Sequence, residues 1–167
     1  VKLVSGFYNP VFYSVAAKEK NDKSYIKELL LLSYQGLFFI FLLVFIILVV
    51  FSNELVLLVF GSQWVEMAPI LEIFGFLCVV KPLNKLNVEV FKTVNKVETL
   101  RRIWLIFVPI FVVGFFIGNF LYGVTGVAVS YLVISFILLI VTTYFVMIIL
   151  DICFAEILRV FSGLVIR

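Results

Sequence analysis

The sequence predicts an all-α protein, a polytopic bundle of transmembrane helices. Of its 167 residues, 65% are hydrophobic and 14% are charged, whereas ordinary soluble domains have about 45–50% and about 25%. The mean hydropathy is +1.27. Long apolar runs such as 37–51 show no period-two alternation, which favours helices over barrel strands. Because so few polar side chains cannot cover a water-exposed surface, a soluble globular enzyme and a disordered chain are both excluded.

Four segments are long enough to cross a membrane. A helix needs about 20 mostly apolar residues to span about 30 Å of hydrocarbon, and we expect spans at about 29–51, 68–91, 103–122 and 126–150. The first has polar residues only near its start, and the fourth is almost free of charge. The second cannot face lipid on all sides, because it contains Glu72, Lys81, Asn84, Lys85, Asn87 and Glu89.

The two ends of the chain predict partial helices. Residues 1–17 form a shorter apolar stretch with Asn9 and Pro10, as expected for the end of a truncated helix. Residues 152–167 place Glu156 and Arg159 among apolar residues, which predicts an interfacial segment or an incoming span. We therefore expect residues 1–167 to form part of one membrane domain, on the carboxyl side of a longer protein.

Basic residues alternate between the segments that connect the spans. Residues 18–28 contain four lysines, and residues 92–102 contain two lysines and two arginines. Residues 52–67 and 121–125 contain neither residue type. Because cytoplasmic loops carry the excess of Lys and Arg, we expect 18–28 and 92–102 in the cytoplasm and 52–67 and 121–125 outside a plasma (inner) membrane.

The second span carries the residues that indicate a binding function. Lys81 and Lys85 are four residues apart and share one helix face, with Asn84 beside them. An ammonium group in hydrocarbon costs roughly 2.5–3.5 kcal/mol on insertion scales. One interpretation is a cationic strip in a central cavity that suits phosphate or an acidic sugar. The other is that both lysines extend to the inner headgroups.

Two carboxylates and two prolines in the spans have competing interpretations. Glu72 and Glu89 are candidates for coupling an ion, although Glu72 is better explained as a cap or a packing partner. Pro82 and Pro109 each remove one backbone donor from a helix, so each predicts either a helix break that exposes backbone to substrate or a packing kink.

The chain lacks residues that several kinds of catalytic and metal site need. The chain has no histidine, so Ser-His-Asp triads, Cys-His pairs and His-ligated zinc sites are excluded. Cys78 and Cys153 lie in or beside apolar runs without C-x-x-C spacing. We therefore expect no metal and no cofactor, and the small net charge of +3 predicts no nucleic-acid partner. Gly114 and Gly118 form a small-xxx-small pair that predicts close helix packing.

Four short motifs occur in an order that resembles a known family. Asn-Pro-Val-Phe-Tyr-Ser at 9–14 precedes a lysine-rich segment and a long apolar span. Val-Phe-Gly-Ser-Gln-Trp at 59–64 precedes Ala-Pro-Ile-Leu at 68–71, and Tyr-Gly-Val-Thr-Gly-Val-Ala at 122–128 opens the last span. From about residue 6 to residue 150, the chain resembles the carboxyl-side half of the polysaccharide and lipopolysaccharide exporters of the multidrug/oligosaccharidyl-lipid/polysaccharide (MOP) flippase superfamily.

The resemblance implies a transporter rather than an enzyme. Such a protein has two helix bundles around a central cavity and moves lipid-diphosphate-linked oligosaccharide across the plasma membrane by alternating access. The translocated oligosaccharide would serve the biosynthesis of a surface polysaccharide, such as lipopolysaccharide, O-antigen, capsule or a teichuronic-type polymer. The implied partners are a polyprenyl diphosphate glycan, membrane lipids, the rest of the transporter chain, and H⁺ or Na⁺. The family's cavity tends to be cationic, which fits Lys81 and Lys85.

Two alternatives stay open. A multidrug or cation antiporter related to the multidrug and toxin extrusion (MATE) proteins would prefer an acidic cavity, whereas this strip is basic. A membrane-embedded transferase of a polysaccharide pathway would lack the usual acyltransferase histidine. It would also lack the paired carboxylates that bind a sugar-nucleotide metal.

Overall fold

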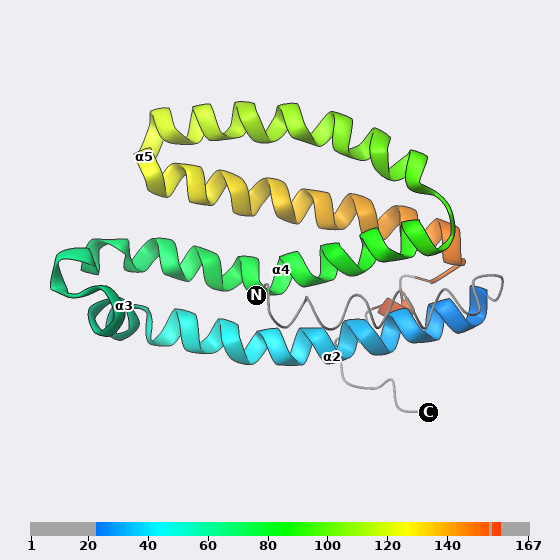
Figure 1. The fold of residues 1–167 in the computed structure, drawn as a ribbon, viewed down its shortest axis with the longest axis horizontal. Helices are drawn as coiled ribbons and strands as arrows, with labels where there is room; N and C mark the ends of the chain where they lie inside the picture. Colours follow the sequence, from blue (N-terminus) through cyan, green and yellow to red (C-terminus); the bar gives the residue numbers. More distant parts are fainter. Residues whose placement is uncertain (1–22, 154, 158–167) are drawn as a thin grey trace.

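The computed structural model describes residues 23–153 and 155–157, and this part of the chain is all-helical (Figure 1). The expected truncated helix at 1–17, the motif at 9–14, and much of the expected segment at 152–167 lie outside the described residues. The elements, in chain order, are α2 (Lys23–Val50), α3 (Ser52–Phe60), the 3₁₀ helix η1 (Ser62–Met67), α4 (Ala68–Thr93) and α5 (Val97–Leu150).

Helix α4 lies in the middle of the bundle, with α2 on one side and α5 on the other (Figure 1). The buried core draws on all three helices, and Leu30, Leu86 and Val146 are almost fully enclosed. The amides Asn84 and Asn87 of α4 are also buried. This central position confirms that the helix with the most intramembrane polar groups does not face lipid on all sides.

The expectation of four separate spans is corrected to three helices that are long and apolar enough to cross a membrane. The expected spans 103–122 and 126–150 both belong to α5, which has 54 residues. A straight helix of that length would measure about 81 Å. Instead, α5 folds back on itself (Figure 1), because Tyr122 (φ −139°, ψ 18°) and Gly123 (φ 59°, ψ −140°) leave helical geometry. Glycine adopts a positive φ without the steric cost of a Cβ.

The two limbs of α5, residues 97–121 and 124–150, approach each other closely at glycines. A Cβ built on Gly118 would stand 2.4 Å from the carbonyl oxygen of Gly126, and one built on Gly126 would stand 2.0 Å from the carbonyl oxygen of Gly118. A Cβ on Gly114 would stand 2.4 Å from Cδ1 of Ile134. The close packing predicted for Gly114 and Gly118 is confirmed, with Ile134 facing Gly114 and Gly126 facing Gly118.

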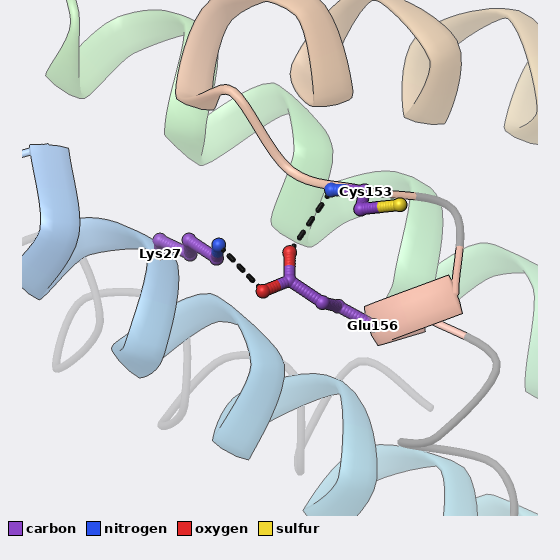
Figure 2. A network of polar contacts seen from close by, with 3 residues as sticks. All are labelled: Lys27, Cys153 and Glu156. Carbon is purple, nitrogen blue, oxygen red and sulfur yellow. Dashed lines mark hydrogen bonds and ion pairs between the residues drawn. The ribbon is translucent and has the colours of Figure 1, made fainter.

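The described parts of the two basic segments, 23–28 and 92–102, lie at one end of the bundle. The start of α2, the α4–α5 connection and the end of α5 meet there, whereas α3, η1 and the turn at Tyr122 lie at the opposite end (Figure 1). Lys23 Nζ lies 3.4 Å from Asp151 Oδ2. Lys27 Nζ lies 2.7 Å from Glu156 Oε1, and the other carboxylate oxygen accepts a hydrogen bond from the Cys153 amide at 2.9 Å (Figure 2). These contacts fasten the chain after α5 to the start of α2.

The outer faces of the long helices are apolar. Leu43, Phe116 and Phe120 are exposed, and Phe120 is 89% exposed. Such faces would be costly in water over so large an area, and they suit contact with acyl chains.

Candidate functional site

Lys81, Asn84 and Lys85 line one pocket of about 240 Å³ between α4 and both limbs of α5. Their i, i+3 and i+4 spacing places them on the α4 face that α5 covers. The other lining residues are Val88, Trp104, Leu138 and Thr142. The structure therefore brings the three candidate binding residues together and adds Trp104 from the first limb of α5.

Two aromatic rings lie beside the ammonium group of Lys81. Its Nζ lies 4.0 Å from the ring centroid of Tyr131 and 5.7 Å from that of Phe111. Phe115 completes a cluster in which the three centroids lie 5.6–5.9 Å apart. Within residues 23–153 and 155–157, no carboxylate forms an ion pair with Lys81. Ring faces attract cations through their quadrupole, so Lys81 has an aromatic environment in place of a counter-charge.

Asn84 and Lys85 occupy different environments in this pocket. The Asn84 amide is buried, donates to the Ser135 carbonyl oxygen at 3.2 Å, and accepts from the Thr142 hydroxyl at 2.9 Å. Lys85 is exposed. Asn84 therefore joins α4 to the second limb of α5, while the Lys85 side chain is exposed at the pocket.

A buried polar network joins the three long helices at Asn87. The Tyr34 hydroxyl of α2 donates to Asn87 Oδ1, and Asn87 Nδ2 donates to the hydroxyls of Thr142 and Thr143 in α5, both at 3.0 Å. The sequence marks Asn87 only as a polar residue in a span, because its partners are more than 50 residues away. Buried polar groups in lipid need such partners, since no water replaces them.

Replacing Asn87 by leucine is expected to destabilise the protein by about 1–2 kcal/mol, because the Tyr34 hydroxyl loses its acceptor and two threonines lose their donor. The thermal midpoint of the purified protein in detergent measures this loss. Asn119→Leu is the matched control, since Asn119 is exposed on the first limb of α5. Equal midpoints for the two variants would show that the network contributes nothing to stability.

The candidate coupling carboxylates lie outside the pocket, and each has a local partner. Glu72 Oε1 accepts from the Ser52 hydroxyl at 2.9 Å, which ties α4 to α3 and supports the packing interpretation. Glu89 is buried and its Oε1 lies 3.1 Å from Lys92 Nζ, one turn along α4. The described residues contain no group of three or more Cys, Asp or Glu side chains that could hold a metal ion.

Neither candidate proline breaks its helix. Pro82 lies inside α4 and Pro109 inside α5, and both helices continue through them. A proline removes one backbone donor, but the neighbouring turns of each helix remain intact. Helical geometry in α5 is interrupted at Tyr122 and Gly123 instead, and neither residue lines the pocket.

Three apolar helices of membrane-spanning length, together with exposed apolar faces, define a multi-pass membrane protein. Residues 1–69 match the family described as "Polysaccharide biosynthesis protein". The described part of that match comprises α2, α3, η1 and the first residues of α4. Neither the curated proteins nor the solved structures contain a match to this chain. The pocket residues of α4 and α5 lie beyond the matched segment.

Proposed function

We propose that this chain is part of a transporter that translocates lipid-diphosphate-linked oligosaccharide across the plasma membrane for surface polysaccharide biosynthesis. The match over residues 1–69 supports the pathway, and the membrane-length helices support a role within the bilayer. The observation that carries the proposal is the pocket in which Lys81 and Lys85 meet between α4 and α5. The chain would act by binding and moving its substrate, not by making or breaking bonds.

The pocket suits a diphosphate. Ammonium groups are compact charges with three donors each, and they bind phosphate oxygens well. Lys85 is exposed, and among the described residues no carboxylate lines the pocket to compete with an anion. The polyprenyl tail would stay in the bilayer beside the apolar helix faces while other segments of the same protein complete the cavity. Alternating access would then carry the headgroup across.

An acidic pocket would favour a multidrug or cation antiporter, and this pocket has the opposite charge. H⁺ or Na⁺ coupling is compatible with the proposal, but Glu72 and Glu89 do not reach the pocket. A coupling carboxylate would therefore come from another part of the transporter.

The direct test is flux in proteoliposomes that contain the full-length native protein. A labelled polyprenyl-diphosphate oligosaccharide should become accessible to an enzyme on the far side faster than in protein-free liposomes. A neutral glycolipid with the same glycan is the control, and it should cross no faster with the protein than without it. Diphosphate-lipid flux equal to that of protein-free liposomes, with correctly folded protein, would reject the proposal.

We also propose that each limb of α5 crosses the membrane, which gives four crossings with the basic end of the bundle in the cytoplasm. Each limb has more than the about 20 residues that a crossing needs. In a Cys153→Ser background, Lys96→Cys should react with an impermeant thiol reagent only from the cytoplasmic side. Thr125→Cys should react only from outside. Labelling of both from one side would contradict the two crossings and the orientation.

A further inference from the structure

The aromatic cluster beside Lys81 has no role in the proposed function so far. We propose that Tyr131 is a positioning residue for Lys81: with Phe111 it forms an aromatic clamp that holds the ammonium group at the pocket for an anionic substrate. The name aromatic clamp is used below for these two rings together with Phe115, which packs against both of them. The inference rests on the proposed function only in taking the anion to be the diphosphate of the lipid-linked substrate.

The clamp assembles from parts that are distant in the sequence. Phe111 and Phe115 are one turn apart on the first limb of α5, and Tyr131 lies on the second limb. The fold-back at Tyr122 and Gly123 brings their rings within 5.6–5.9 Å of one another. Lys81 reaches this cluster from α4, and its Nζ lies closest to Tyr131, at 4.0 Å. The position of one ammonium group therefore depends on α4 and on both limbs of α5.

At an anion-binding site, an aromatic ring can hold an ammonium group without repelling the anion, which a carboxylate cannot do. A carboxylate would hold the ammonium group but would neutralise it and repel the phosphate oxygens. A ring face attracts the cation while adding no net negative charge, so the full positive charge of Lys81 remains available. Lys85 provides the contrast: it is exposed, and within the described chain it has no cation–π contact. The clamp therefore fixes the position of the Lys81 ammonium group, whereas it does not hold the Lys85 ammonium group in place.

The cation–π contact with Lys81 involves the ring of Tyr131 and not its hydroxyl group. Two substitutions of Tyr131 should therefore have different effects. Tyr131→Leu removes the ring, whereas Tyr131→Phe keeps it. A desolvated cation–π contact corresponds to a change of roughly 5- to 30-fold in an equilibrium constant. In reconstituted full-length protein, Tyr131→Leu should raise the KM for the diphosphate lipid by that factor with kcat little changed. Tyr131→Phe should keep the wild-type KM, because it keeps the ring. A purely structural role would lower the amount of folded protein and would not produce this split.

Amine labelling tests the clamp without any transport measurement. The native protein in liposomes is treated with a small membrane-permeant amine reagent, and the labelling of Lys81 is divided by that of Lys85 using mass spectrometry. Tyr131→Leu should raise this ratio severalfold, because the ring no longer covers the ammonium group, and Tyr131→Phe should leave it unchanged. Phe111→Leu removes the more distant ring and should raise the labelling ratio less. It replaces Tyr131→Leu in this test if Tyr131→Leu does not fold.

The two measurements separate the two proposals. A raised labelling ratio in a protein that does not transport the lipid would reject the transport function and keep the clamp. An unchanged labelling ratio in Tyr131→Leu would overturn the clamp, whatever the flux. If Tyr131→Leu does not fold, an unchanged ratio in Phe111→Leu would overturn it. A KM that rises equally in Tyr131→Leu and Tyr131→Phe would also overturn it, since the hydroxyl and not the ring would then be responsible.

Discussion

Replacing Gly126 by alanine is expected to destabilise the protein by about 2 kcal/mol or more, although alanine is normally the better helix former by about 1 kcal/mol. The added Cβ would stand 2.0 Å from the Gly118 carbonyl oxygen and 2.8 Å from its carbon, and both are backbone atoms. A backbone cannot rotate away as a side chain can, so the limbs of α5 must separate. The thermal midpoint of the purified protein in detergent measures the change.

Gly75→Ala is the matched control for this prediction. Gly75 also lies in a buried helix, but its nearest neighbour would be the side-chain atom Cγ2 of Val49 at 3.3 Å. That side chain can shift by a few tenths of an ångström, so the variant should stay near wild-type stability. Gly118→Ala should reproduce the loss seen for Gly126→Ala, and the double variant should lose less than the sum, because one separation of the limbs relieves both contacts. Equal midpoints for Gly126→Ala and Gly75→Ala would contradict the close approach.

The positions of the long helices could be predicted from the sequence because membrane-length apolar runs have few interpretations. The expected span 29–51 lies within one residue of the end of α2 at Val50, and the expected span 68–91 begins where α4 begins. The start of α2 at Lys23 was missed, since charged residues extend that helix beyond its apolar part. The connection expected at 121–125 coincides with the fold-back of α5, where Tyr122 and Gly123 leave helical geometry.

The candidate site could be predicted only in part. Helical spacing placed Lys81, Asn84 and Lys85 on one face, and they do line one pocket. Periodicity cannot say which distant residues cover that face, so Tyr131 was not found. Spacing also cannot choose between neighbours: Glu89 lies one turn from both Lys85 and Lys92, and the structure pairs it with Lys92.

Replacing Lys81 by alanine is expected to reduce transport of the diphosphate lipid about 10- to 100-fold at unchanged protein level. The change removes one of two ammonium groups from a partly enclosed pocket that no carboxylate of the described residues lines. A charge-assisted hydrogen bond contributes about 1.5–3 kcal/mol, and each 1.4 kcal/mol is a factor of about ten. The initial rate of flux in proteoliposomes measures the effect. Lys81→Arg should retain more activity than Lys81→Ala, because it keeps the charge and a cation that stacks on aromatic rings.

Lys96→Ala is the control that separates a local effect from a general loss of positive charge. Lys96 is exposed in the connection between α4 and α5 and does not line the pocket, yet its removal changes the net charge by the same amount. It should leave flux unchanged. If Lys96→Ala and Lys81→Ala reduced flux equally, the overall positive charge of the bundle would govern transport. If neither changed it, the diphosphate would bind elsewhere in the transporter and the pocket between α4 and α5 would be a packing feature of the bundle.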